Sequence, residues 1–400
     1  MSLKNSRKVL ILIPNFVGYS GGVVNEIQLA KSLCKERACI IVGLTKVSEL
    51  LSLREFMANL RAERWSQNTI ILPLPLLRPY TISLLLVSIL IVPIIWLLDK
   101  LKYIEFIYVR SSPLAFGIML VPSLARKACV KIPAIFEDEV LSWGRIFSPI
   151  YRLTDRVVLD KASCIGIASP LLLKEIALRR RIVPKGKIVW IPAGIDREKM
   201  AMIKTYFKSY KKVDTFIIGF IGSLEWWQGV DTLVKAFAKI KGSLSQPIKL
   251  LIVGDGSERR KIEILCRELE VYCHITGFVD HYTALRLLRT FDVLVLPRTR
   301  ISSTESIIPI KVIEAWALGV PVITTRHKIY DYLGLRDRED VVFCEPVPDD
   351  VADKIQTILR DGELRRRLIM RGPELAKNYY YDEIARNLVK VIECSKRNNR

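Results

Sequence analysis

The stretch 306–323 contains the residue types best suited to bind a phosphorylated ligand. Pro309 and Lys311 stand where the pattern predicts a helix to begin, and Gly319 stands where that helix should stop. The apolar run 293–296 before it predicts a buried strand. A helix that begins beyond the carboxyl end of a parallel strand presents unpaired backbone N–H groups and the positive end of its dipole. We therefore expect a diphosphate to bind at this helix end.

Glu314 lies inside the same predicted helix among apolar neighbours. A buried carboxylate needs a partner, and its oxygens can accept hydrogen bonds from the two hydroxyls of a ribose. An ion pair with a nearby lysine or arginine is the structural alternative. Lys311, Arg298 and Arg300 would supply positive charge for the diphosphate, although a solvated loop also explains the two arginines.

Two further groups of residues follow predicted strands, at the edge where parallel sheets bind ligands. Gly21 and Gly22 permit close approach of the backbone to a phosphate, or form an ordinary turn between strand and helix. Glu137 and Asp138, with Glu139, could take the proton of a reacting hydroxyl, or could cap a helix N-terminus. The sequence does not decide between Glu137 and Asp138 as a base.

The elements that must position these residues form two successive halves in which short apolar runs alternate with helix-like stretches. The runs cover 9–13, 40–42, 69–72, 106–109, 134–136, 163–168 and 188–191, and then 215–221, 248–253, 274–276, 293–296, 321–324 and 341–343. Continuously apolar runs are typical of parallel strands covered on both faces. The basic stretch 197–214 predicts a linker, and a last helix is expected over 373–394. The pattern therefore predicts two doubly wound α/β domains in tandem.

The segment 82–98 departs from this pattern because it is almost entirely apolar, its other members being Ser83, Ser88 and Pro93. A full membrane span is not expected, since the strands before and after it should share one sheet. Two interpretations stay open: a buried helix of the domain, or a helix that lies in a membrane interface. The basic charge of the chain favours the second.

Composition narrows the function. The eight cysteines include no C-x-x-C pair and no metal-like cluster, so we expect reduced thiols in a cytoplasmic protein, and no metal. No secretory signal is expected, since the N-terminus is polar and its first apolar run is short. The net charge of +21 requires an anionic partner or surface. Nucleic acid is not expected, because the basic runs contain no recognition motif.

The segment 311–323, KVIEAWALGVPVI, is similar to the carboxyl end of the E-x7-E signature of family 4 glycosyltransferases. Other family landmarks match in order along nearly the whole chain: a glycine loop at Gly21 and Gly22, a P-N-G-h-D-like motif at 191–196, the start of a second domain at 220–223 and 228–231, and segments 253–256 and 275–279. Each match alone is weak. Their common order makes the resemblance specific.

The resemblance implies a GT-B fold, meaning two Rossmann-like domains that face an interdomain cleft. It implies an acceptor-side domain over 1–200, completed by a helix at 376–400, and a nucleotide-sugar domain over 201–375. It also implies retention of configuration, no metal and no cofactor. The donor-binding residues would be Gly21, Gly22, Gly222, Ser223, Gln228, Gly277, Phe278, Arg298, Glu305, Ser306, Pro309, Ile310 and Glu314. Lys311 would act with Glu137 and Asp138 in catalysis, by neutralising the diphosphate.

Several positions depart from the family pattern. Ser306 stands where the family has the glutamate that holds the donor sugar, and Glu305 is one residue out of register. Ser223 and Gln228 replace the usual arginine and lysine, as in a subset of the family with a similar W-Q-G motif. The first-domain histidine common in the family is absent.

From the residues and the resemblance together we predict a peripheral or monotopic protein of the cytosolic membrane face. It would transfer a sugar from a UDP- or GDP-sugar to a lipid-linked, phospholipid or glycan acceptor. Two alternatives stay open. A non-catalytic subunit of the same fold is suggested by the missing cations and glutamate. An epimerase or phosphorylase would instead act on soluble substrates, and segment 82–98 would then have no membrane role.

Overall fold

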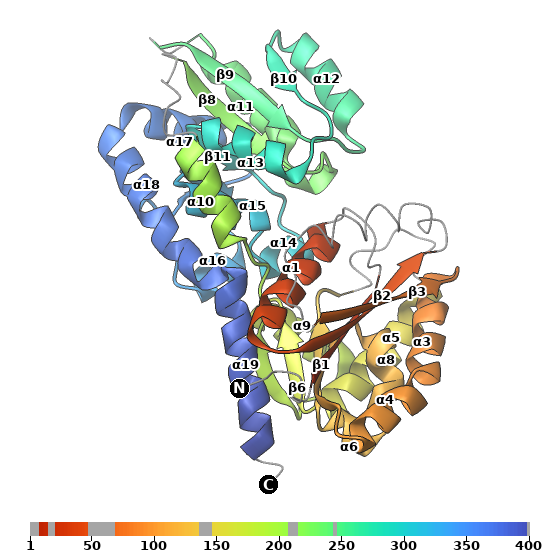
Figure 1. The fold of residues 1–400 in the computed structure, drawn as a ribbon. Coiled ribbons are helices and arrows are strands. Elements are labelled where there is room, and N and C mark those ends of the chain that lie inside the picture. The colour runs from red at the N-terminus through yellow and green to blue at the C-terminus, as the bar shows by residue number, and fades with distance from the viewer. Residues whose placement is uncertain are drawn as a thin grey trace. The chain divides into compact units, whose positions relative to one another are not determined.

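The computed structural model describes residues 8–14, 21–46, 69–135, 146–206, 215–242 and 246–397 (Figure 1). The chain forms two compact units: the first contains Met1–Gly194 and Tyr381–Arg400, and the second contains Ile195–Tyr380. The family resemblance implied crossings near 200 and 376. The chain crosses after Gly194 and returns at Tyr381.

The first unit is built on a sheet of seven parallel strands in the order β3-β2-β1-β4-β5-β6-β7. The strands are β1 (Lys8–Ile13), β2 (Cys39–Lys46), β3 (Thr69–Leu76), β4 (Ile104–Arg110), β5 (Ala128–Ile132), β6 (Cys164–Ile167) and β7 (Lys187–Trp190). The central strands are buried on both faces, which explains their uninterrupted apolar sequences. The two-domain α/β prediction is confirmed in this half.

Helices on both faces complete the first unit. They are α1 (Gly21–Glu36), α3 (Tyr80–Leu90), α4 (Val92–Lys100), α5 (Ser112–Met119), α6 (Pro122–Ala125), α8 (Ser148–Lys161), α9 (Pro170–Arg180) and α19 (Tyr381–Arg397). Helix α19 lies along α1 (Figure 1), and its buried residues Ile384, Leu388 and Ile392 belong to the same hydrophobic cluster as β1. The last helix is therefore part of the first unit.

The second unit is built on six parallel strands in the order β10-β9-β8-β11-β12-β13. They are β8 (Phe216–Ile221), β9 (Ile248–Val253), β10 (Cys273–Ile275), β11 (Val293–Leu296), β12 (Val322–Thr325) and β13 (Val342–Cys344). The helices are α10 (Arg197–Tyr206), η4 (Trp226–Gln228), α11 (Val230–Ile240), α12 (Arg259–Glu268), α13 (His281–Thr290), α14 (Ser302–Ser306), α15 (Ile310–Leu318), α16 (Lys328–Tyr332), α17 (Pro348–Arg360), α18 (Gly362–Ala376) and η5 (Lys377–Tyr379).

Three predicted elements were placed wrongly. The strand predicted at 134–136 lies earlier, as β5, because Lys131 interrupts its apolar run and is nevertheless buried. The last helix begins at Tyr381, since α18 continues through Pro373 and ends in η5. The predicted linker begins with α10, whose Met200 and Ile203 are buried in the second unit.

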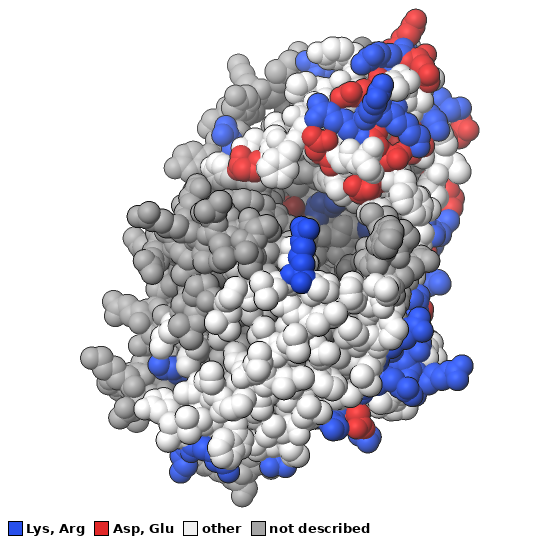
Figure 2. All heavy atoms as spheres, turned by 90° about the vertical axis from the view of Figure 1, so that its right-hand side faces the viewer, with Lys and Arg blue, Asp and Glu red and all other residues white. Residues whose placement is uncertain are grey.

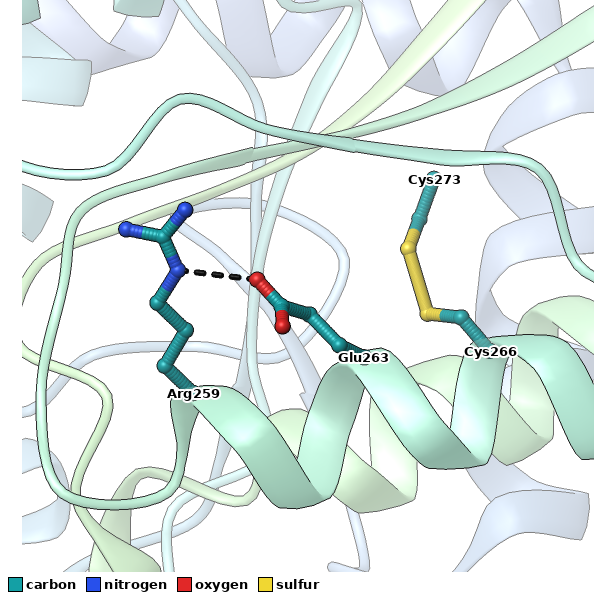
Figure 3. The surroundings of a disulfide bond; sticks show 4 residues. All are labelled: Arg259, Glu263, Cys266 and Cys273. Atoms are coloured by element: carbon teal, nitrogen blue, oxygen red, sulfur yellow. Dashed lines mark hydrogen bonds and ion pairs between the residues drawn. A yellow bond between two sulfur atoms is a disulfide. The ribbon is translucent and has the colours of Figure 1, made fainter.

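Two disulfides contradict the prediction that all the cysteines are reduced. Cys129 of β5 pairs with Cys164, which lies directly opposite on β6. Cys266 near the end of α12 pairs with Cys273 at the start of β10, on the same helix as the ion pair between Arg259 and Glu263 (Figure 3). The spacing of these cysteines along the chain resembles no disulfide motif, so the pairing depends on the fold.

Candidate functional site

Strands β8 and β11 are neighbours in the second sheet, and the chain leaves them toward opposite edges. From β8 it continues to β9, and from β11 it continues to β12 on the other side. Ligands of doubly wound sheets bind beyond the carboxyl ends of such a pair of strands. Gly222 follows β8 directly, Arg298 follows β11 after one residue, and α15 begins shortly beyond, with Pro309 as its N-cap and Ile310 as its first residue.

Lys311 lies in the first turn of α15 with its amine directed at the end of β8. Its Nζ is 3.3 Å from Oε1 of Gln228 and 4.8 Å from the centre of the Phe220 ring. Gly222 has a φ of +131°, and a Cβ built on it would lie 2.2 Å from the Lys311 amine. A side chain at position 222 would therefore be strained and would displace the lysine. Burial, and then repulsion by Arg298, lower the pKa of Lys311 to about 7.

Arg298 brings a second positive charge to the same place. Its Nε and Nη1 atoms are shielded from solvent and make no hydrogen bond. Burial lowers the pKa of Arg298. Across the described parts of the chain, neither Arg298 nor Lys311 forms an ion pair, and shielded cations without a counter-ion are unfavourable. The arrangement is that of a site whose anion is supplied by a ligand.

The other donor-site residues at this edge lie around the two cations. Gln228 is buried in η4, and its Nε2 donates to Oγ of Ser223 at 3.5 Å. Gly277 pairs by an isolated bridge with Gly254, and a Cβ on Gly254 would meet the Gly222 carbonyl oxygen at 1.9 Å. The backbones at the ends of β8, β9 and β10 are therefore in close contact. Phe278, next to Gly277, is 76% exposed. Trp226 is 55% exposed and packs edge-on against Trp227.

Glu314 is 4% exposed, and its Oε1 lies 2.7 Å from Nε2 of His281 at the start of α13. The expected alternative partner was a lysine or arginine, but the neighbour is this partly exposed histidine. The second carboxylate oxygen takes no part in that bond. Glu314 also favours the charged form of Lys311, so it lies within electrostatic range of the cation site.

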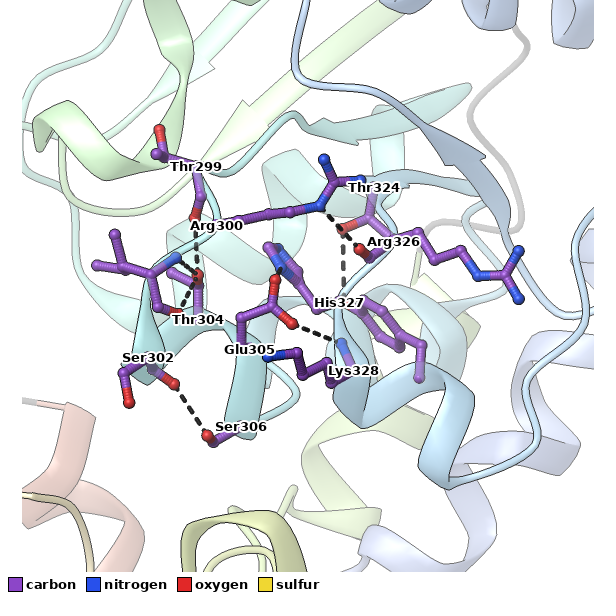
Figure 4. Close-up of polar contacts among 12 residues, drawn as sticks. Thr299, Arg300, Ser302, Thr304, Glu305, Ser306, Thr324, Arg326, His327 and Lys328 are labelled. Atoms are coloured by element: carbon purple, nitrogen blue, oxygen red, sulfur yellow. Dashed lines mark hydrogen bonds and ion pairs between the residues drawn. The ribbon is translucent and has the colours of Figure 1, made fainter. Parts of the chain in front are cut away.

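Glu305 and Ser306 are the last two residues of α14, which lies beside the start of α16 (Figure 4). Oε2 of Glu305 accepts a hydrogen bond from the backbone amide of Lys328 at 2.9 Å, and Oγ of Ser306 donates to the carbonyl of Ser302 at 2.9 Å. Glu305 thus caps α16. Arg300 forms a bidentate ion pair with Glu345, in which Nη1 and Nη2 donate to Oε2 and Oε1 at 2.6 and 2.7 Å. Its charge is therefore already paired, unlike that of Arg298.

His327, beside Glu305, was not predicted as a site residue. Its side chain is fully buried, and neither ring nitrogen makes a hydrogen bond; Nδ1 is 3.6 Å from Oε1 of Glu305. Burial and then Arg298 lower the pKa of His327 to about 4, so the ring is neutral near pH 7. No sequence motif marked this histidine, because a lone histidine after a strand is usually part of the core.

In the first unit, Gly21 and Gly22 open α1. Glu137 and Asp138 lie outside the described residues.

Sequence reasoning missed a buried charge cluster in the first unit. Glu26 of α1 accepts hydrogen bonds from Lys131 Nζ at 2.6 Å and from the Tyr108 hydroxyl at 2.8 Å, and one of its oxygens lies 3.5 Å from Arg110 Nε. Arg110 and Lys131 stand opposite each other on β4 and β5. Charged residues at the ends of neighbouring apolar strands were the available signal.

Two doubly wound parallel units in tandem, with two shielded cations near a helix start at the switch point of the second, are the arrangement of a GT-B fold. Sucrose-phosphate synthase from Thermosynechococcus elongatus superposes with a TM-score of 0.69 at 19% identity, over 97% of this chain and 98% of that one. Anabaena HepE, solved in complex with UDP, superposes with a TM-score of 0.68 at 14% identity, over 97% of this chain and 100% of that one.

Sequence comparison matches part of the chain to one family. Residues 202–375 match the family described as "Glycosyl transferases group 1". An uncharacterized glycosyltransferase of Methanocaldococcus jannaschii is 28% identical over 185 residues, 46% of each chain. The lipopolysaccharide core biosynthesis glycosyltransferase LpsE of Rhizobium meliloti is 27% identical over 228 residues, 56% of this chain and 59% of that one. A phosphatidyl-myo-inositol mannosyltransferase of Mycobacterium leprae is 25% identical over 231 residues, 57% and 59%.

These alignments span about half the length of the curated relatives. The chain has the GT-B fold, and residues 202–375 within its second unit match the group 1 glycosyltransferase family.

Proposed function

We propose that this chain is a retaining glycosyltransferase. It takes a sugar from a UDP- or GDP-sugar and passes it to a lipid-linked, phospholipid or glycan acceptor at the cytosolic face of a membrane. The observation that carries the proposal is the pair of cations, Lys311 and Arg298, near the start of α15, neither of which forms an ion pair with any residue that the structure describes. A diphosphate has the charge and size that such a pair requires. Family relatives named for lipopolysaccharide and phosphatidylinositol substrates support the acceptor class.

In the proposed reaction the diphosphate lies against Lys311 and Arg298, and Glu314 binds the ribose hydroxyls. The bond between the sugar anomeric carbon and the β-phosphate oxygen breaks, and the acceptor hydroxyl attacks the same face. The leaving phosphate oxygen takes the acceptor proton, so no protein base is required. The two cations stabilise the negative charge that develops on the leaving diphosphate.

Nucleotide binding tests the cation pair directly. Calorimetry with UDP and with GDP should detect a complex, and Arg298→Gln should weaken it by about tenfold or more, because a charge-assisted hydrogen bond is lost. Arg300→Gln is the matched control, since that arginine already pairs with Glu345. A wild-type chain that binds neither nucleotide would replace the proposal with the non-catalytic alternative. Equal losses in both variants would remove the special role of Arg298.

The ribose role of Glu314 has its own test. Wild type should bind UDP about tenfold more tightly than 2′-deoxy-UDP, because the deoxy ligand leaves a carboxylate oxygen unpaired. Glu314→Gln should bind both ligands weakly and with similar affinity, and transfer should fall accordingly. Full discrimination by a folded Glu314→Gln chain would assign the ribose to other residues. A panel of nucleotide sugars incubated with membrane lipid extract, with products identified by mass, would then define donor and acceptor.

A further inference from the structure

The segment Tyr80–Lys100 presents its apolar side chains outward. It runs as α3 and α4 with one turn residue between them, and only 28% of it is buried. Leu86 and Leu90 are 53% and 73% exposed. With the other exposed apolar members they define what we call the outer stripe, consisting of Ile82, Leu86, Ile89, Leu90, Ile94, Trp96 and Leu97. Their spacing of mostly three or four residues places them along one side of the segment.

The inner side of α3 is the more polar one. Thr81, Ser83 and Ser88 are buried there. Oγ of Ser88 donates to the Leu85 carbonyl at 2.6 Å and accepts from the Gly117 amide at 3.2 Å, so α3 packs closely on α5. A surface helix in water has the opposite arrangement, with its apolar side inward. The outer stripe is therefore suited to apolar surroundings.

The surface around the stripe continues the pattern. Leu77, Leu101 and Tyr103, at the two ends of the segment, are also more than half exposed. Figure 2 faces the side on which α3 and α4 lie, and shows a broad area without charged residues in its lower half, with lysine and arginine side chains along the border. Contiguous exposed apolar surface of this kind marks an interaction site.

By length and composition alone, this is the one helix in the described parts of the chain that could cross a membrane. The sheet excludes that arrangement. Strands β3 and β4, which precede and follow the segment, run parallel in the same sheet, so a span would place them on opposite sides of the bilayer. We propose instead that α3 and α4 lie flat in the interface of an anionic membrane, with the outer stripe inserted among the acyl chains.

The charges at the border favour lipid over a second copy of this chain. No charged residue stands between Arg78 and Asp99, and Asp99 is paired with Lys127. Arg78, Lys100 and Lys102 are exposed at the ends of the segment, and the Lys100 amine lies 5.4 Å from the centre of the Trp96 ring. Cations beside aromatic rings at this level anchor proteins to headgroups. Two copies joined through the stripe would bring these like charges together.

Co-sedimentation of the whole chain with vesicles tests the proposal. Vesicles of phosphatidylcholine with phosphatidylglycerol should bind the wild type more tightly than phosphatidylcholine alone. The double variant Leu86→Asp, Leu90→Asp should lower the partition coefficient about tenfold or more. Leu178→Asp is the control, because Leu178 is 65% exposed on α9 of the same unit and outside the stripe. Brominated lipid should quench tryptophan fluorescence less in Trp96→Phe than in wild type.

Two results would overturn the inference. One is loss of vesicle binding by Leu178→Asp to the same extent as by the double variant. The other is a wild type that ignores vesicles and forms a dimer, seen by light scattering, that the double variant dissociates; the stripe would then be a self-association surface.

The inference goes beyond sugar transfer and stands on the first unit alone. The double variant should still bind UDP in solution with unchanged affinity, since the cation pair lies in the second unit. Membrane binding without nucleotide binding would contradict the proposed sugar transfer and leave this inference intact. Nucleotide binding without membrane binding would contradict this inference and leave sugar transfer intact.

Discussion

Lys311 has a pKa of about 7 in the folded chain, because burial disfavours its charged form and Arg298 repels it, against 10.5 for an ordinary lysine. Between these two values the unfolded chain binds more protons than the folded chain. The free energy of unfolding should therefore rise as the pH increases from about 7 toward 10.5. Below pH 7 the amine is protonated in both states, and its burial destabilises the ligand-free fold fully.

We expect Lys311→Met to stabilise the free chain by on the order of 2 kcal/mol at about pH 6 and to abolish most of its UDP affinity. Urea unfolding measures the first effect and calorimetry the second. Lys235→Met, on the exposed side of α11, should change neither by much. Loss of stability together with loss of binding would show that the lysine supports the fold rather than a ligand.

At the residue scale, charge at the end of a predicted element was the signal that sequence reasoning used. Lys311 and Arg298 both belong to the stretch around a strand end and a helix start, and the structure places them together. Arg110 and Lys131 stand at the ends of β4 and β5 and so gave the same kind of signal, but their partner Glu26 lies inside α1, far from both in sequence. These charges can be buried only as pairs, and the pairs form only when α1, β4 and β5 pack together in the folded unit.

The Glu26 cluster joins three elements: α1, β4 and β5. Burial alone would raise the pKa of Glu26, but Lys131 and Arg110 hold it below 4.5. Its contribution to stability is present above the unfolded value and is lost as the pH falls through the lowered folded pKa.

Glu26→Gln should destabilise the first unit by on the order of 3 kcal/mol near pH 7, because two buried cations lose their carboxylate. Denaturant unfolding measures the loss. Glu393→Gln, which removes an exposed partner of Arg37 in the same unit, should cost at most about 0.5 kcal/mol. Similar losses of unfolding free energy in the two variants would mean that the buried cluster stabilises the fold no more than an exposed ion pair does.

Each disulfide links two neighbouring elements: β5 to β6, and α12 to β10. Four cysteines, Cys34, Cys39, Cys344 and Cys394, are free. Thiol titration of the denatured, unreduced chain should count four thiols, and titration after reduction should count all eight. Eight thiols without reduction would restore the original prediction of a fully reduced protein.

Element prediction worked best where apolar runs were unbroken, as in β1 and β11. It failed where tertiary contacts override local pattern. The α18 helix continues through Pro373, and Gly372 beside it allows α18 to approach the Trp316 backbone of α15, where a Cβ would lie 2.9 Å from the Trp316 carbonyl oxygen. The sequence of α3 and α4 predicted either burial or a membrane interface; the structure buries one side of α3 and leaves the outer stripe exposed.

At the scale of the whole molecule, the two-unit architecture followed from repetition of the same alternating pattern. The discontinuity of the first unit did not, because no local pattern says which sheet a helix will join. Gly194 shows the physical reason: a Cβ there would lie 2.5 Å from the Tyr381 ring, so the glycine admits the returning helix.

Truncating an inward side chain of α19 should therefore weaken the first unit alone. We expect Leu388→Ala to cost about 2–5 kcal/mol. Hydrogen exchange should show lost protection in β1 and α1, with β8 and β11 unchanged. Arg386→Ala, on the exposed side of the same helix, is the control. Uniform loss of protection in both sheets would mean that the two units unfold as one.

During translation, α19 is made only after the entire second unit has been synthesised. Until then the apolar side of α1 that α19 covers stays open to solvent and to chaperones. The second unit, which is uninterrupted in sequence, has no such wait. The half that is synthesised first is thus expected to complete its hydrophobic core last, and α3 and α4, which we propose to lie in a membrane interface, would be made before their own domain is complete.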